Sequence, residues 1–173
     1  LFVTPGTYAT FADGGESRPL IGMHTHPLPF HLWCDKYECG QRLTVADIEQ
    51  VPPACWPPEL KCRSRMHYYL ADKRAREIEP GARALLLDEG DAVTEASTAN
   101  ILIYRQAEGL ISPPKEHILP GVTVAVIEEL AGQLSIPFLH RELYVPDVAN
   151  ADEVLLCSTS PCIWSVTGLN GQP

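Results

Sequence analysis

The chain has 173 residues, of which 45% are hydrophobic and 20% are charged, a composition that supports one globular domain or one and a half. Its formal net charge of −9 argues against nucleic acid or an anionic membrane as the main partner. No apolar run approaches the roughly 18 residues of a membrane span, and the N-terminal residues lack the basic flank of a signal peptide, so we expect a cytoplasmic protein.

Residues 1–60 are rich in Pro, His, Cys and Trp and show little periodicity. Their pattern predicts a strand at 1–4, a loosely ordered segment at 12–30, a short helix near 31–38 and a strand at 42–50. A connector with four prolines follows at 51–58, and proline disfavours both helix and central strand. The chain begins without Met and its last residues form no clear ending, so we expect a piece of a longer protein.

From residue 61 onward the pattern becomes regular. Residues 66–79 predict a helix with an inward face made of Tyr68, Ala71, Ala75 and Ile78. Residues 122–134 predict a second helix, with an inward face made of Val126, Ile127, Leu130, Ala131 and Leu134. Strands are expected at 84–87, 100–104, 110–111, 138–143, 154–157 and 163–166, with turns at 89–91 and 106–109. Mixed helices and strands indicate an α/β or α+β fold.

Six cysteines stand in the chain without any C-x-x-C spacing, so reduced thiols are the expectation. Cys157 and Cys162 are expected to be buried packing residues rather than a redox pair.

The segment VTEASTAN, residues 93–100, places one carboxylate, Glu95, beside small residues in what reads as a surface hairpin. Two further segments could bind an anion: 119–123, where Gly121 opens a helix with free N–H groups, and 157–160 at a strand end. Each signal alone is weak, because Gly-Val-Thr is usually a plain helix cap and Ser-Thr-Ser is usually a turn.

Lys61 emerges from the proline connector just before a helix, where a surface lysine is the ordinary interpretation. An amine, a phosphate site and a lone carboxylate are, however, what pyridoxal 5′-phosphate requires for its aldehyde, its phosphate and its ring nitrogen.

The order of motifs after Lys61 carries a resemblance: LADKRA (70–75), ALLLD (84–88), VTEASTANI (93–101), ISPP (111–114), ILPGVT (118–123) and ADEV (151–154) before Ser158-Thr159. Together they resemble the class IV aminotransferases, the fold-type IV pyridoxal-phosphate enzymes, over residues 61–166. This family includes branched-chain and D-amino-acid aminotransferases and 4-amino-4-deoxychorismate lyase. The resemblance implies a mixed α/β cofactor-binding domain of the D-amino-acid-aminotransferase-like fold at 61–173. Residues 1–60 would be the end of a smaller N-terminal domain plus the interdomain linker.

The resemblance also implies roles for individual residues. Lys61 would form the Schiff base with pyridoxal 5′-phosphate and carry the proton between Cα and C4′, and Glu95 would pair with the ring nitrogen. The phosphate would be held by the start of the second helix and the strand-end turn, that is by Val122, Thr123, Ser158 and Thr159. Ser97 and Thr98 would line the cofactor or its waters. The family further implies a homodimer that acts on an amino acid and a 2-oxo acid.

Several positions depart from the usual family pattern: Ala96 replaces Gly, Val124 replaces Arg, Ser64-Arg65-Met66 replaces Asn or Asn-Tyr, and Ser160-Pro161-Cys162 replaces small-Ala-Glu. Amino transfer, possibly of branched-chain amino acids, is the leading expectation. Pyruvate release from an aminodeoxychorismate-like substrate is the alternative, and an inactive fragment that depends on a partner is the third.

His24, His26, His31, Cys34 and Cys39 are metal-ligand types in a short span. No C-x-x-C or H-E-x-x-H spacing supports a site, so no metal is expected and a substrate-side loop is favoured. The basic residues from 63 to 76 read as a solvated helix face, although Arg63 or Arg65 could reach a substrate carboxylate.

Overall fold

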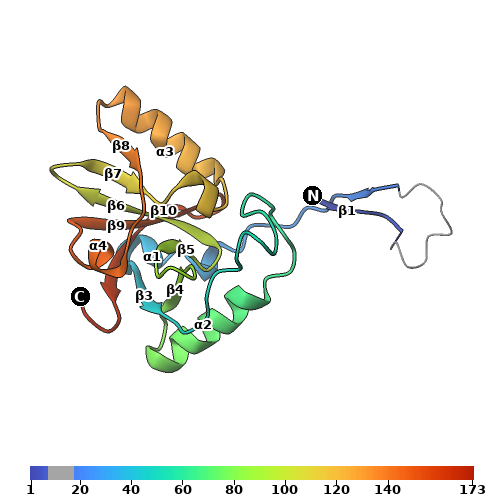
Figure 1. Ribbon diagram of the computed structural model, residues 1–173, viewed down its shortest axis with the longest axis horizontal. Helices are drawn as coiled ribbons and strands as arrows, with labels where there is room; N and C mark the ends of the chain where they lie inside the picture. Colours follow the sequence, from blue (N-terminus) through green and yellow to red (C-terminus); the bar gives the residue numbers. More distant parts are fainter. Residues whose placement is uncertain (8–17) are drawn as a thin grey trace.

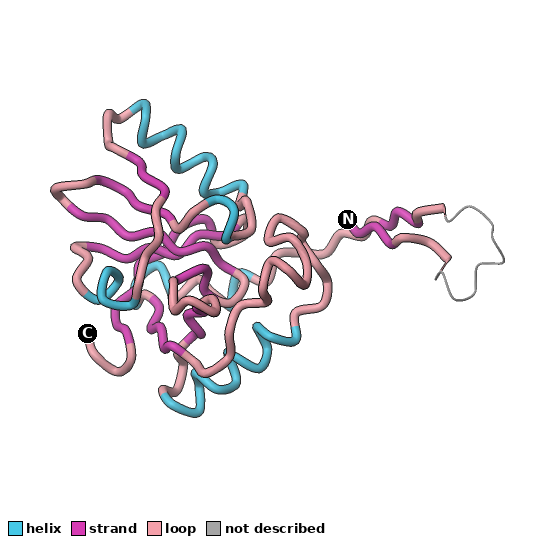
Figure 2. The backbone as a smooth tube through the Cα atoms, in the orientation of Figure 1, coloured by secondary structure: helices cyan, strands magenta, loops and turns pink. Residues whose placement is uncertain are grey.

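The computed structural model describes residues 1–7 and 18–173 (Figure 1). Its N-terminal part holds a two-stranded antiparallel sheet, β1 (Phe2–Thr4) and β2 (Leu20–Gly22), which projects from the body as an arm (Figure 2). Two short helices, η2 (Phe30–Leu32) and α1 (Lys36–Cys39), then lead into the main sheet.

The main sheet has the strand order β5-β4-β3-β10-β9-β6-β7-β8. An additional pairing of β5 with β6 closes six of these strands into a ring, and β7 and β8 extend the sheet beyond it. The strands are β3 (Gln41–Val45), β4 (Arg83–Leu87), β5 (Val93–Ala96), β6 (Ala99–Arg105), β7 (Gly109–Ser112), β8 (Phe138–His140), β9 (Glu153–Ser158) and β10 (Cys162–Leu169).

Alternation along the strands divides the apolar residues between two faces, because successive side chains of a strand point in opposite directions. In β6, Ile101 and Ile103 join the large core cluster that also holds Leu43, whereas Leu102 packs in the cluster under α3. In β4, Leu85 faces the large core and Leu86 faces α2. The strands are therefore covered by apolar groups on both sides.

Two helices cover this sheet from outside (Figure 1). α2 (Met66–Ile78) packs Ala71 and Ala75 on β4, as the sequence predicts, but Ile78 is 54% exposed. α3 (Val122–Gln133) buries Val124, Ile127 and Ala131. The remaining helical segments are η3 (Lys115–His117) and α4 (Val145–Ala149).

The prediction for the inward face of α3 was therefore wrong in part, since Val126 and Leu130 lie on its outward face and Leu134, directly after its last residue, is also exposed. Apolar residues of α3 follow a helical spacing on its outward face as well as on its buried face, so spacing alone does not identify the buried face.

The strand prediction also needs corrections. The strand expected at 42–50 ends at Val45, and the one expected at 138–143 ends at His140. β5 and the short helix α4 were not predicted, and neither was β2, which lies inside the segment expected to be loosely ordered. Residues 12–17 of that segment lie outside the described part of the chain.

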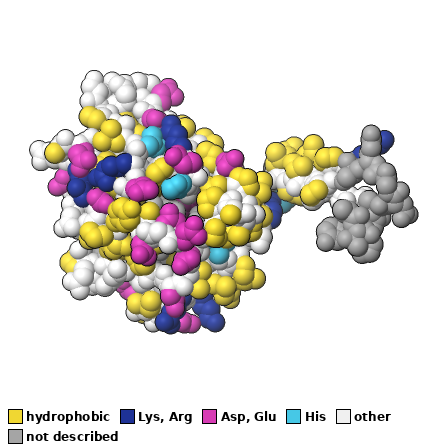
Figure 3. Space-filling model, viewed as in Figure 1, with side chains coloured by type: hydrophobic (Ala, Val, Ile, Leu, Met, Phe, Trp, Pro, Cys, Tyr) yellow, Lys and Arg dark blue, Asp and Glu magenta, His cyan; other side chains and the backbone are white. Residues whose placement is uncertain are grey.

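The domain boundary at residue 60 stays a prediction. β3 precedes that boundary and lies in the main sheet, between β10 and β4. Within residues 1–7 and 18–173, no helix has the length and apolar character needed to cross a membrane. Acidic side chains are spread over the face of the body shown in Figure 3, which agrees with the net charge of −9.

Candidate active site

A cavity of about 810 Å³ lies where the loop before α2, the β5–β6 hairpin, the start of α3 and the β9–β10 turn meet. The proposed site residues line it together, with the exception of Ser97: Lys61, Glu95, Thr98, Val122, Thr123, Ser158 and Thr159. Segments that are far apart in the sequence thus bring an amine, a carboxylate, hydroxyls and a helix N-terminus to one place.

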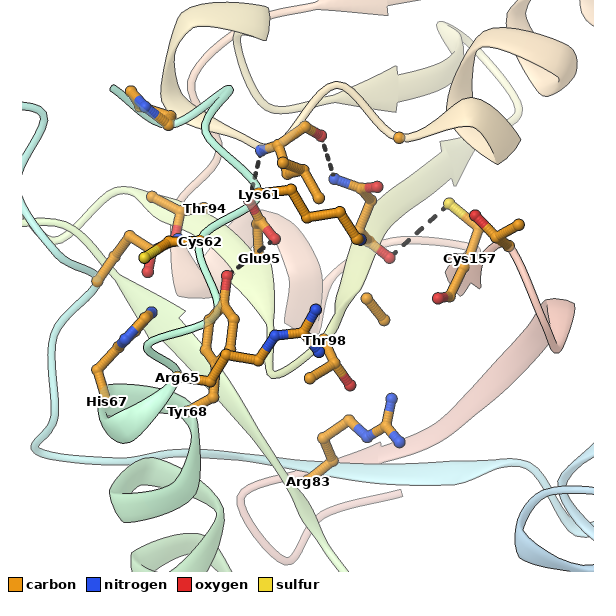
Figure 4. Close-up of a pocket in the computed structure, with 18 of the residues that line it drawn as sticks. Lys61, Cys62, Arg65, His67, Tyr68, Arg83, Thr94, Glu95, Thr98 and Cys157 are labelled. Atoms are coloured by element: carbon orange, nitrogen blue, oxygen red, sulfur yellow. Dashed lines mark hydrogen bonds between the residues drawn. The ribbon is translucent and has the colours of Figure 1, made fainter. Parts of the chain in front are cut away.

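Lys61 lies in the exposed loop that connects the proline-rich segment to α2. Figure 4 shows its side chain extended across the cavity, in the region of Glu95. The Lys61 ammonium attracts the Glu95 carboxylate and so acts to lower the pKa of that carboxyl. The two opposite charges therefore influence each other inside the same cavity.

Glu95 lies on β5 and is only 3% exposed. Burial raises the pKa of its carboxyl to about 7, because removal from water disfavours the charged form. Three neighbours oppose this shift: the Leu119 N–H, which donates to Oε1 at 2.5 Å, the Tyr68 hydroxyl, which donates to Oε2 at 3.4 Å, and Lys61. Hydrogen bonds from Leu119 and Tyr68 thus hold the carboxylate in position, but among the described residues it has no ion-pair partner.

The hairpin around Glu95 differs from the predicted loop. Glu95 pairs with Asn100 and Ala96 with Ala99, so only Ser97 and Thr98 form the turn. Thr98 adopts φ 62°, a left-handed conformation that is uncommon for a residue with a branched side chain. The acid therefore projects from a buried strand rather than from a surface loop.

Ser97 is placed differently from the prediction. It is fully buried, and its hydroxyl donates to Asp72 Oδ1 on α2 at 2.5 Å. It is absent from the cavity lining, whereas Thr98 lines the cavity. Ser97 thus ties the turn to α2, and Thr98 presents the hairpin to the cavity.

The start of α3 is held against the same hairpin. The Asn100 side chain donates from Nδ2 to the Leu119 carbonyl at 2.9 Å, and the Leu119 N–H donates to Glu95. A Cβ on Gly121 would collide with Asn100 Oδ1, so only glycine fits here without displacement. Val122 and Thr123, the first residues of α3, therefore have their free N–H groups fixed relative to Glu95.

The β9–β10 turn brings Ser158 and Thr159 to the cavity. Cys157 before them is buried as predicted, and its Sγ donates to the Asn100 carbonyl. Burial, with a smaller effect of Glu95, raises the pKa of the Cys157 thiol to about 12, so this thiol is not a nucleophile near neutral pH. Cys162 is exposed, which corrects the expectation that packing buries it.

Tyr68, Arg83 and Asn100 are polar residues of the cavity lining that were not assigned to the site from the sequence. Tyr68 was expected only to pack on the inward face of its own helix, α2, yet its hydroxyl contacts Glu95. Burial, followed by the charge of Glu95, raises the pKa of Tyr68 to about 12. Arg83 and Asn100 face the cavity because of the strand register, which local patterning does not reveal. No local sequence signal could have identified them.

The histidine and cysteine segment does not form a comparable site. The His24 and His26 rings are stacked with centroids 6.1 Å apart, but neither lines the cavity. Within the described ranges, no group of three His, Cys, Asp or Glu side chains gathers in a way that could hold a metal ion. Leu32, Trp33 and Lys36 of the same segment do line the cavity, so the expectation of a loop on the substrate side stays a prediction.

The family model and the related sequences that match this chain all describe aminotransferases. The sequence model of the family described as amino-transferase class IV matches residues 5–169. A probable branched-chain-amino-acid aminotransferase of Thermotoga maritima is 31% identical over 134 residues, which are 77% of this chain and 48% of that protein. A D-alanine aminotransferase of Staphylococcus aureus is 31% identical over 133 residues, which are 76% of this chain and 44% of that protein. The chain spans about half the length of these curated relatives.

Solved structures agree with these relatives. A putative branched-chain amino acid aminotransferase from Thermotoga maritima matches with a TM-score of 0.70 and 31% identity, over 79% of this chain and 48% of its own. A 4-amino-4-deoxychorismate lyase from Pseudomonas aeruginosa matches with a TM-score of 0.74 and 26% identity, over 98% of this chain and 62% of its own. The mixed α/β fold expected from the resemblance is confirmed.

Proposed function

The chain belongs to the class IV aminotransferase family, and from this premise we propose that its cavity binds pyridoxal 5′-phosphate and moves an amino group from an amino acid to a 2-oxo acid. The observation that carries the proposal is the buried Glu95 carboxylate, which shares a cavity with the Lys61 amine. A buried carboxylate without an ion-pair partner is costly, and a protonated pyridine nitrogen supplies the missing positive charge.

The other donors of the cavity also fit this cofactor. The free N–H groups at the start of α3 and the hydroxyls of Thr123, Ser158 and Thr159 suit a phosphate group. Lys61 is the amine that would bind the aldehyde, and Thr98 would line the cavity beside the cofactor. Ser97 would contribute only indirectly, through the Asp72 hydrogen bond that fixes the turn.

Bound pyridoxal 5′-phosphate supplies an aldehyde and a ring that accepts electrons from a substrate carbanion. Glu95, when ionised, would keep the ring nitrogen protonated, and the Leu119 N–H would hold the carboxylate in place. Lys61 Nζ would take the proton from the substrate Cα, since a free amine is a suitable base for that step. The hydroxyls and the helix N-terminus would fix the phosphate, so that the reacting carbon stays within reach of Lys61.

The proposal is tested by following amino transfer in the full chain with pyridoxal 5′-phosphate and pyruvate or 2-oxoglutarate as acceptor. Branched-chain L-amino acids and D-alanine are offered as donors. The Lys61→Ala variant is expected to lose turnover entirely while still folding, because the residue lies in an exposed loop. Turnover retained in Lys61→Ala would reject the proposed role of this lysine.

A lyase that releases pyruvate is the second candidate, because the match to the Pseudomonas aeruginosa lyase extends over 98% of the chain. Pyruvate released from an aminodeoxychorismate-type substrate without any amino acceptor would favour it over amino transfer. Absence of cofactor binding would instead favour an inactive fragment that depends on a partner. We also propose a homodimer and a cytoplasmic location, which size determination in solution and cell fractionation would test.

A further inference from the structure

Arg83 is a cation of the cavity that the proposed chemistry leaves without a role. It is the first residue of β4, it is half-buried, and it lines the same cavity as Lys61 and Glu95. Its guanidinium lies over the ring of Trp164, 5.5 Å from the ring centroid. Stacking on an aromatic face restrains the guanidinium plane and leaves its N–H edge available for hydrogen bonds. Figure 4 shows the side chain extended in the direction of Thr98.

This guanidinium lacks an acceptor in the described part of the chain, where it takes part in no hydrogen bond or ion pair. Asp72 is the acid that attracts it electrostatically, but the Asp72 oxygens are already used. Oδ1 accepts from the Ser97 hydroxyl and from the Ala84 N–H, and Oδ2 pairs with Arg76. Asp72 therefore acts on Arg83 only at a distance, and its carboxylate is shared with Arg76, Ser97 and Ala84.

An unpaired and half-buried guanidinium is an unfavourable arrangement for the protein alone. Burial lowers the pKa of Arg83 because the charged form loses hydration, although Asp72 partly opposes this effect. The group carries five N–H donors in a planar fork that matches a carboxylate in two hydrogen bonds. A ligand anion would supply the acceptors that the described residues do not.

Arg65 is the other arginine that lines the cavity, and it differs from Arg83 in its surroundings. Arg65 is exposed at the start of α2, so water can solvate its charge. Arg83 is half-buried and stacked on Trp164, so its orientation is restrained before any ligand arrives. The better preorganised of the two cations is therefore Arg83.

We propose that Arg83 is a specificity-determining residue that binds a carboxylate of the substrate through its guanidinium edge. The inference deepens the proposed function, since it concerns the substrate side of the same cavity. A carboxylate is favoured over the cofactor phosphate because, in the proposed function, the start of α3 and the Thr123 and Thr159 hydroxyls would bind the phosphate. The cavity would then have two anion sites of different chemistry, one for a phosphate and one for a planar carboxylate.

The test measures binding of unreactive acids to the full chain by calorimetry, so it depends on neither cofactor nor turnover. Glutarate and valerate have the same carbon chain and differ in one carboxylate. Arg83→Gln is expected to weaken binding about tenfold to a hundredfold, the value of a lost charge-assisted pair. Arg83→Lys should recover part of the loss, because it keeps the charge but not the planar fork. Arg74→Gln, which removes a charge outside the cavity, is the control and should not change binding.

The pattern of losses identifies the carboxylate concerned. Equal losses for glutarate and valerate indicate the carboxylate common to all amino acids, and a loss for glutarate alone indicates a second carboxylate on the side chain. Inorganic phosphate is titrated as a third ligand. Unchanged binding of both acids in folded Arg83→Gln and Arg83→Lys would overturn the proposal, and so would a loss of binding confined to phosphate. Acid binding that depends on Arg83 in a chain that does not bind pyridoxal 5′-phosphate would leave this inference standing and reject the proposed function instead.

Discussion

Replacing Glu95 by Gln should stabilise the cofactor-free chain, and the gain should grow with pH. The carboxyl has its pKa raised from 4.5 to about 7 in the folded chain because it is buried. The folded state thus binds this proton more tightly than the unfolded state. Ionising Glu95 therefore costs stability progressively as the pH rises from about 4.5 to about 7, and the full penalty applies above pH 7. Glutamine carries no such penalty.

The size of the effect follows from the shift. At about 1.4 kcal/mol per pKa unit, the penalty is about 3 kcal/mol above pH 7 and about 1 kcal/mol at pH 5.5. The glutamine carbonyl can still accept from the Leu119 N–H, so any change in hydrogen bonding contributes an offset that does not depend on pH. The difference in unfolding free energy between variant and parent should therefore rise by about 2 kcal/mol from pH 5.5 to 8.5.

Urea unfolding of parent and variant at these two pH values measures this difference. Glu116→Gln, at an exposed acid outside the cavity, is the matched control and should show no comparable rise. A difference for Glu95→Gln that is the same at both pH values would show that burial does not perturb this carboxyl. Saturation with pyridoxal 5′-phosphate should make the parent more stable than Glu95→Gln, because the parent then gains a positively charged partner for Glu95.

Three further substitutions test the surroundings of Glu95. Gly121→Ala should destabilise the chain by about 1–3 kcal/mol, because the new Cβ collides with the Asn100 side chain. Gly132→Ala is the control: its Cβ meets open space on α3, so it should stabilise the chain by up to about 1 kcal/mol. Equal effects of the two substitutions in thermal unfolding would show that the contact with Asn100 does not require glycine at position 121. Thr123→Val should weaken pyridoxal 5′-phosphate binding by only about 1–2 kcal/mol, since the backbone N–H donors stay. Unchanged affinity in a fluorescence titration would show that the start of α3 does not bind the phosphate. Tyr68→Phe removes a donor to Glu95 and should raise the pKa of that carboxyl further. The loss of stability that begins near pH 4.5 should therefore continue to a higher pH and become larger in the unfolding experiment.

The two long helices could be predicted because their apolar residues recur with helical spacing over more than ten residues. The inward face of α3 could not, because apolar residues occupy both its buried positions and the outward row through Val126 and Leu130. Which row is buried depends on where the sheet lies, and that is a property of the tertiary structure.

The hairpin of β5 and β6 shows a second limit. Small and hydroxyl-bearing residues such as Ser97 and Thr98 resemble a surface loop, but only Thr98 is exposed. Ser97 is buried by contacts with Asp72 of α2 and Ala84 of β4, which are distant in sequence. The closure of six strands into a ring depends on β5 pairing with both β4 and β6, which no local pattern specifies.

The grouping of Lys61 with Glu95 was predicted by resemblance rather than by spacing, and the cavity lining agrees with it. Tyr68, Asn100 and Arg83 were not predicted, because their approach to the cavity depends on strand register and on the rotation of α2. Residues whose role depends on one local motif can be found in the sequence, and residues that act through a neighbour on another element cannot.

In the proposed function, Lys61 is the amine that holds pyridoxal 5′-phosphate. The chain has four lysines, and Lys36 also lines the cavity, so the position of the bound cofactor can be decided chemically. Borohydride reduction of the cofactor-loaded full chain, followed by peptide mapping, measures it directly. We expect the label on Lys61, and we expect it to disappear in Lys61→Ala. A label on Lys36, Lys73 or Lys115 in the folded protein would contradict it.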